Sequence, residues 1–116
     1  MPLYADNSKE ILRGLLKLSN NNLVALSYQK LSVTGTAVSL TVPDTARYAL
    51  ITVESSITTP AIRYLELGDT SLPTATNGLP KSTLDTFDVA GYQNLINFRA
   101  IQVGAGTHTL HIQYYK

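Results

Sequence analysis

The chain has no cysteine, no tryptophan and few charged residues. With 0 cysteines in 116 residues, neither a disulfide framework nor a thiolate metal site can form. Charged residues make up 15% of the chain, against a usual fraction of about 25%. The 9 Lys and Arg residues are scattered and the net charge is +1, whereas a phosphate-binding surface needs clustered cations. We therefore expect neither a nucleic-acid partner nor a bound cofactor.

Long hydrophobic runs are also missing. The N-terminal segment 1–6 lacks the basic start and following apolar stretch of a signal peptide. The nearest apolar segment, 11–18, is interrupted by Arg13, Gly14 and Lys17 and is shorter than the roughly 20 residues that span a bilayer. We expect no membrane partner and synthesis in the cytoplasm.

Residues 1–22 carry the helical pattern of the chain and are predicted to be an arm with a short helix. Apolar residues between 8 and 18 recur at helical spacing, after Asn7 or Ser8, which can cap the free N–H groups. Gly14 weakens this helix by up to about 1 kcal/mol relative to alanine. The helix packs either on its own sheet edge or on a neighbouring subunit or another protein. The arm residues predicted to contact a partner are Leu3, Tyr4, Ile11, Leu12, Leu15 and Leu16.

From residue 23 onward, the pattern is that of strands separated by turns. Short runs rich in Val, Ile, Leu, Thr and Tyr, spaced by roughly 8–12 residues, are typical of an all-β sandwich or barrel. The segment 47–55 is apolar on both faces and is therefore expected at the centre of a sheet. The segment 70–81 is rich in turn-forming residues and is predicted to be a loop. The predicted strands are Leu23–Leu31, Thr36–Val42, Arg47–Ser55, Ala61–Leu67, Thr83–Val89, Leu95–Val103 and Thr107–Tyr115.

The last two predicted strands are expected to form a β-hairpin. They flank the short Gly104-Ala105-Gly106 segment, and a short glycine-containing link between two such runs is a hairpin signal. Because side chains alternate across a strand, one face of each arm is expected to be buried. In the second arm that face consists of Leu110, Ile112 and Tyr114.

The sequence predicts no catalytic residues and no metal site. His108 and His111 lie three apart on a predicted strand, so they point to opposite faces, and we expect both to be solvated. No nucleophile elbow, zinc-protease or phosphate-loop motif occurs. Acidic residues near turns are more often turn formers than glycosidase pairs or calcium ligands. The two acidic pairs considered are Glu66 with Asp69 and Asp85 with Asp88.

The 7 tyrosines supply rings with a polar tip, which suit sandwich rims and protein interfaces. Tyr48 and Tyr114 are expected to complete the core. Arg63, Tyr64 and Tyr115 are predicted to contact a partner. An alternative function is a carbohydrate-binding module in which exposed tyrosines such as Tyr64, Tyr92 or Tyr115 stack on a sugar.

Several short motifs between residues 43 and 116 match one known pattern. They are Tyr48-Ala49-Leu50-Ile51-Thr52-Val53-Glu54, Pro60-Ala61-Ile62-Arg63-Tyr64, Gly68-Asp69, Pro73-Thr74-Ala75, Gly78-Leu79, Leu84-Asp85-Thr86-Phe87-Asp88, Leu95-Ile96-Asn97-Phe98-Arg99-Ala100-Ile101 and Tyr114-Tyr115-Lys116. In this respect the chain resembles small β-sandwich virion proteins of tailed bacteriophages.

The resemblance implies an antiparallel β-sandwich over residues 23–116, jelly-roll-like or Greek-key-like, with about seven or eight strands. It implies a structural virion protein without enzymatic activity, most of all a capsid cement or decoration subunit that binds the major capsid protein and stabilises the head. A neck, tail or head-fibre accessory protein is the alternative. The expected partners are the major capsid protein or other virion proteins, and a homo-oligomer is expected, with a trimer favoured. Identical weak contacts would then add up through multivalency.

Overall fold

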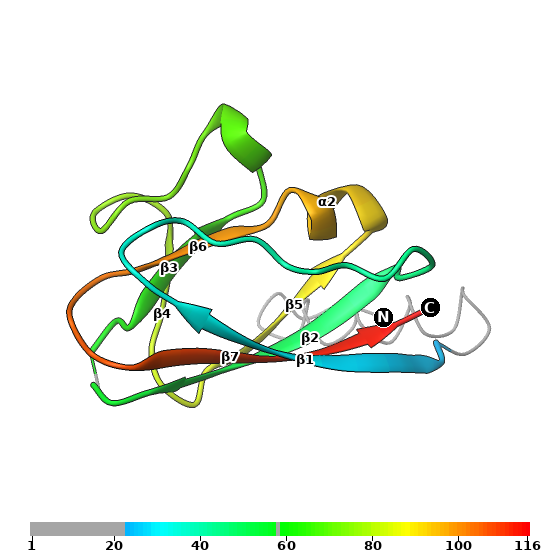
Figure 1. The fold of residues 1–116 in the computed structure, drawn as a ribbon, viewed down its shortest axis with the longest axis horizontal. Coiled ribbons are helices and arrows are strands. Elements are labelled where there is room, and N and C mark those ends of the chain that lie inside the picture. The colour runs from blue at the N-terminus through cyan, green and yellow to red at the C-terminus, as the bar shows by residue number, and fades with distance from the viewer. Residues whose placement is uncertain (1–22, 58) are drawn as a thin grey trace, which may run out of the picture.

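The computed structural model describes residues 23–57 and 59–116, which form a mostly β fold (Figure 1). The predicted arm helix lies outside the described residues. None of the described helices is long and apolar enough to cross a membrane. The elements in chain order are β1 (Ala25–Val33), β2 (Tyr48–Ser55), β3 (Ile62–Leu65), the 3-10 turn η2 (Gly68–Thr70), β4 (Leu79–Lys81), β5 (Thr86–Ala90), α2 (Tyr92–Ile96), β6 (Arg99–Gln102) and β7 (His108–Tyr115).

The described strands form two antiparallel sheets in a β-sandwich-like arrangement. One sheet has four strands in the order β1-β7-β2-β5, and the other has three in the order β4-β3-β6. Figure 1 shows β3 and β6 lying across one face of the four-stranded sheet. The first and last strands are neighbours, since β1 pairs with β7 along its whole length.

The core lies between the sheets and is built by alternating apolar residues in the middle of β2 and β7. Ala49, Ile51 and Val53 of β2 are fully buried, and β2 pairs with β7 on one side and β5 on the other. This confirms the prediction of a central strand. The predicted inward face of β7 is buried too and consists of Leu110, Ile112 and Tyr114. Burial of each such large apolar side chain stabilises the fold by about 1.5–3 kcal/mol.

Three aromatic rings join the two sheets. Tyr64 of β3 lies 4.5 Å from Phe87 of β5 and 5.3 Å from Phe98, centroid to centroid, with near-parallel planes. Phe87 and Phe98 are 6.3 Å apart. Offset aromatic pairs of this kind contribute about 0.5–1.5 kcal/mol beyond the area they bury. We call Tyr64, Phe87 and Phe98 the aromatic cluster.

The predicted hairpin between residues 95–103 and 107–115 is wrong. Residues 92–96 form the helix α2, and the strand that follows, β6, pairs with β3 in the three-stranded sheet. Strand β7 instead pairs with β1 and β2 in the other sheet. Both runs do bury an apolar face, but they bury it from opposite layers of the core.

The glycine-containing link therefore carries the chain from one sheet to the other. The amide of Val103 donates to the carbonyl of Ala61 at 3.0 Å, and the amide of Ser56 donates to the carbonyl of Thr107 at 3.0 Å. Gly106 has a φ of +136°, and a Cβ there would lie 2.7 Å from the Oγ of Ser56. Glycine is needed at this position for the crossing, because an L side chain would clash.

Two further predictions need correction. In place of the strand Thr36–Val42, there is an isolated bridge between Val38 and Ala100, with N···O distances of 2.8 and 3.0 Å. The predicted loop 70–81 ends in the short strand β4, in which Pro80 lies opposite Arg63. Proline is tolerated there because β4 is an edge strand and needs no amide donor on its open side.

Candidate protein-contact surface

The residues predicted to contact a partner have different positions. Those of the arm lie outside the described residues: Leu3, Tyr4, Ile11, Leu12, Leu15 and Leu16. Tyr64 is buried within the aromatic cluster, so the surface position expected for its ring is wrong. Tyr115 is half-buried and packs edge-on against Tyr48 at 5.5 Å, centroid to centroid. Tyr48 and Tyr114 are buried, as predicted.

Arg63 binds the loop that follows its own strand. Its Nε donates to the carbonyl of Ala75 at 3.2 Å, and its Nη1 donates to the carbonyl of Gly78 at 2.8 Å. Gly78 has a φ of +124°, and a Cβ there would lie 3.1 Å from the Cβ of Arg63. Hydrogen bonds to a charged donor stabilise by about 1.5–3 kcal/mol. Arg63 therefore fixes the far end of this loop.

The near end of the same loop is fixed by Arg99 and its neighbours. The amide of Gly68 donates to the carbonyl of Asn97 at 2.8 Å, and the Nε of Arg99 donates to the Oδ1 of Asp69 at 3.1 Å. The Nη1 of Arg99 also donates to the carbonyls of Ile96 and Phe98. The loop therefore has an ordered conformation set by cationic side chains from β3 and β6.

This fixed loop presents leucine side chains to solvent. Leu67, Leu72 and Leu79 are 55%, 47% and 52% exposed. Figure 1 shows the segment with η2 standing out from the three-stranded sheet, away from the four-stranded one. Scattered exposed leucines are ordinary, but three on one anchored segment, the last of them at the start of β4, make this segment a candidate contact for a partner. We call residues 66–79 the leucine loop. In the sequence, Leu72 and Leu79 lie within the predicted loop 70–81, whereas Leu67 was predicted to end the strand Ala61–Leu67.

Another exposed leucine lies in the turn between β4 and β5. Leu84 is 78% exposed and has a φ of +70°, which L side chains rarely adopt. The turn is held by the amide of Ser82, which donates to Asp85 Oδ2 at 2.7 Å, and by the amide of Leu84, which donates to the carbonyl of Val53 at 2.7 Å. The left-handed conformation costs about 1–2 kcal/mol for a non-glycine residue.

Leu84→Gly is expected to raise the free energy of unfolding by roughly 0.5–1 kcal/mol. The strain of the left-handed backbone disappears, and the greater freedom of glycine in the unfolded chain offsets part of that gain. Urea unfolding measures the change. Leu84→Ala is the matched control, since it removes the exposed side chain but keeps the Cβ and the strain. A loss of stability in Leu84→Gly would contradict the strain argument.

The two histidines face opposite sides of β7, as predicted, but His108 is buried and not solvated. Its Nε2 donates to the carbonyl of Gly104 at 2.8 Å, and its Nδ1 accepts from the hydroxyl of Ser55 at 2.8 Å. A neutral ring satisfies both bonds, because it has one donor and one acceptor nitrogen. His108 thus links the end of β2 to the glycine-containing segment that connects the two sheets.

The acidic residues mostly hold turns. Asp69 pairs with Arg99, and Asp85 accepts from the amide of Ser82. Burial raises the pKa of Glu66, and the nearby charge of Asp88 raises it further. The charge that acts on Glu66 is thus that of Asp88 on β5, whereas Asp69, the other member of the acidic pair considered above, is bonded to Arg99. Within the described ranges, no group of three or more His, Asp or Glu side chains could hold a metal ion.

Comparisons of the chain with protein-family models, with curated proteins and with solved structures find no match in any of the three. Inference about function therefore depends on the residues of this chain. Of its described surfaces, the leucine loop combines apolar exposure with a fixed backbone, a combination that lowers the entropic cost of binding a protein partner.

Proposed function

We propose that the chain is a structural protein of a tailed-phage virion, a capsid cement or decoration subunit that binds the major capsid protein and stabilises the head. The observation that carries this proposal is the leucine loop, whose apolar side chains are held in place by Arg63 and Arg99. A surface fixed before binding loses little conformational entropy when the partner docks. Repetition of one modest contact over a shell multiplies its effect through multivalency.

The order of the strands in the two sheets also supports the proposal, although it concerns the fold and not the partner. We propose that the fold is a jelly roll. Counting the Val38 bridge as a strand beside β6 adds one to the seven named strands, giving eight. Renumbered along the chain, one sheet then reads 1-8-3-6 and the other 5-4-7-2. Eight-stranded jelly rolls are found in viral capsid and lectin domains. Because a fold alone does not decide function, the leucine loop remains the main argument.

We also propose that the chain acts as a homo-oligomer, with a trimer favoured, on the phage particle. A trimer would place three leucine loops on one assembly, so each loop could contact a neighbouring capsid subunit at the same time. Light scattering of the purified chain at micromolar concentration tests this directly. A monomeric chain under these conditions would contradict the proposed homo-oligomer. It would not decide whether the chain binds the capsid, which the next experiment tests.

Replacing Leu67, Leu72 and Leu79 together with serine is expected to weaken binding to phage heads by about 100-fold. Each leucine is half exposed and would contribute on the order of 1 kcal/mol when a partner covers it. Cosedimentation measures binding to heads that lack this protein, taken from the phage that encodes the chain. The thermal midpoint should stay within a few degrees, because these side chains lie outside the core.

Val24→Ser is the matched control, since Val24 is also about half exposed but lies outside the leucine loop. It should leave head binding unchanged. Full binding by the folded triple variant would overturn the leucine loop as the contact surface. Binding of the wild-type chain to tails or necks but not to heads would favour the alternative role as an accessory protein there.

A further inference from the structure

The outer face of the four-stranded sheet, which points away from the core, carries polar and aromatic side chains in register. Tyr28 and Leu50 lie on either side of Gln113, and Lys30 and Thr52 lie on either side of His111. Side chains of paired residues point to the same face of a sheet. We call this surface the outer face; the residues of it that matter here are Tyr28, Lys30, Leu50, Thr52, Glu54, Thr109, His111 and Gln113.

A chain of two hydrogen bonds crosses the outer face diagonally. The hydroxyl of Tyr28 lies 2.6 Å from the Nδ1 of His111, and the Nε2 of His111 lies 2.7 Å from the Oε1 of Glu54. A carboxylate accepts, so Nε2 carries a proton, and in the neutral ring Nδ1 then accepts from the phenol. Diagonal neighbours on adjacent strands are within reach of long side chains. Tyr28 is therefore held in place although it is 60% exposed.

The rings of Tyr28 and His111 lie side by side and nearly parallel, and we call the pair the Tyr28–His111 plate. Their planes differ by only 18° and their centroids are 6.1 Å apart. The lone pair of an imidazole nitrogen lies in the ring plane, so a phenol bonded to it approaches edge to edge and not face to face. Two near-parallel rings joined in this way present a common aromatic surface larger than either ring alone.

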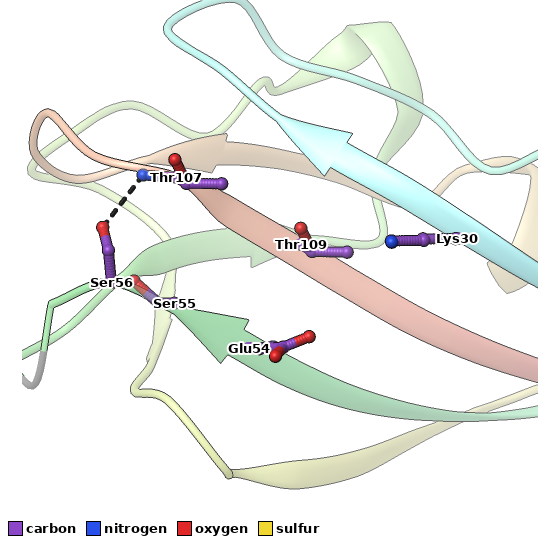
Figure 2. Close-up of a pocket in the computed structure, with 6 residues that line it drawn as sticks. All are labelled: Lys30, Glu54, Ser55, Ser56, Thr107 and Thr109. Atoms are coloured by element: carbon purple, nitrogen blue, oxygen red, sulfur yellow. Dashed lines mark hydrogen bonds between the residues drawn. The ribbon is translucent and has the colours of Figure 1, made fainter.

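Two hollows flank this plate. The larger, of about 320 Å³, is lined by Lys30, Glu54, Ser55, Ser56, Thr107 and Thr109. Figure 2 shows Lys30 and Glu54 extending from β1 and β2 on either side of Thr109. The smaller, of about 160 Å³, is lined by Tyr28, Leu50, Thr52, His111 and Gln113. Because Glu54 lines one hollow and His111 the other, their hydrogen bond marks the boundary between the two.

We propose that the outer face binds a short neutral oligosaccharide, with one sugar ring on the Tyr28–His111 plate and the neighbouring sugar in the larger hollow. The C–H groups on one side of a sugar ring carry partial positive charge, which suits the negative face of an aromatic ring. Sugar hydroxyls both donate and accept hydrogen bonds. The hollows offer both kinds of partner, from the Lys30 ammonium to the Glu54 carboxylate and the Gln113 amide.

The charge balance of the larger hollow favours a neutral ligand. Lys30 and Glu54 line the same hollow and offset each other, so the hollow selects neither an anion nor a cation. A nucleic acid would need a row of cations, and a protein hot spot would need a well-packed apolar centre. The volume of the larger hollow is at the lower end of the range of about 300–1,000 Å³ typical of small-molecule sites.

The tyrosine that makes this site differs from those named by the sequence. Tyr64 is buried and Tyr115 packs on Tyr48, which leaves Tyr92, at 39% exposed, outside the outer face. Tyr28 combines the larger exposure with a fixed position beside two hollows. Tyr92 is therefore the natural control residue.

The test is a titration of the isotope-labelled chain with neutral hexasaccharides of glucose, galactose, mannose and N-acetylglucosamine, followed by amide NMR. At least one is expected to shift the resonances of β1 and β7 that carry Tyr28, His111 and Gln113. Tyr28→Ala should weaken that binding by about tenfold or more, because the plate is lost. Tyr28→Phe keeps the ring but loses the bond to His111, so it should have a smaller effect.

Gln113→Ala, which leaves both rings in place, is a second variant and should also weaken binding. Tyr92→Ala should change nothing. The triple leucine-loop variant should keep oligosaccharide binding, so this proposal can fail independently of the capsid contact. The proposed site would be overturned if none of the four oligosaccharides bound, or if Tyr28→Ala and Tyr92→Ala weakened oligosaccharide binding equally. Loss of head binding in Tyr28→Ala, with no sugar bound by the wild type, would make the outer face a protein-contact surface instead.

Discussion

Phe98→Ala is expected to lower the free energy of unfolding by about 3–5 kcal/mol. Phe98 is fully buried, and its ring lies 5.3 Å from Tyr64 and 6.3 Å from Phe87. Its removal leaves a cavity between two sheets that cannot collapse without breaking strand pairing. Since domains of this size are stable by about 5–15 kcal/mol, the loss takes a large part of the total. Urea unfolding followed by circular dichroism measures it.

Two comparison variants separate the cavity from other effects. Phe98→Leu keeps most of the volume and should cost about 1.5 kcal/mol or less. Tyr92→Ala removes an aromatic ring from a partly exposed position and should change stability by about 0.5 kcal/mol at most. A loss below about 1 kcal/mol in Phe98→Ala would mean that the aromatic cluster does not join the sheets.

Raising the pH from 10 towards 12 is expected to destabilise the fold through two buried phenols. Burial, and then the charges of Glu66 and Asp88, raise the pKa of Tyr64 from 10.0 to about 12. Burial raises the pKa of Tyr114 from 10.0 to about 12. The unfolded chain releases these protons at a lower pH than the folded chain does. The stabilisation is therefore complete below pH 10 and is lost as the pH approaches 12.

The loss should be on the order of 2 kcal/mol for each tyrosine, measured as the change in free energy of urea unfolding between pH 9 and pH 12. Tyr64→Phe and Tyr114→Phe keep the rings but remove the ionisable hydroxyls, so each should make the pH dependence less steep. Tyr114→Phe also loses a hydrogen bond to the Oε1 of Gln29, so its slope with pH is the relevant readout and not its absolute stability. Unchanged slopes in both variants would contradict this account.

The long strands could be predicted from the sequence because apolar residues that face the core recur along each of them with a period of two. In β2 and β7 the middle residues alternate between core and surface, so the apolar buried faces Ala49-Ile51-Val53 and Leu110-Ile112-Tyr114 were predicted correctly, whereas the burial of His108 was not. The central place of β2 followed from its apolar second face. Short elements such as β4 and α2, with 3 and 5 residues, are too brief to show a period and were missed.

The candidate sites were only partly predictable, because they depend on contacts between distant segments. Arg63 was predicted to contact a partner, and in the structure its guanidinium binds the leucine loop of its own chain. Tyr64 was predicted at the surface, although the aromatic cluster buries it. On the outer face, alternation alone predicts the direction of His111. Its bonds to Tyr28 and Glu54 require the register of three strands, which no local pattern supplies.

The sequence by itself determined that disulfides are absent, that strands dominate and which face of each long strand is buried. These properties are local, since composition and a two-residue period reside within one segment. Only the tertiary structure decided which sheet each strand joins, and so replaced a hairpin with a crossing at Gly106. Several strands have equally apolar faces, so the sequence of each strand does not specify which neighbour it pairs with. Packing among residues that are distant in the sequence decides the pairing. The leucine loop and the outer face exist because of that outcome.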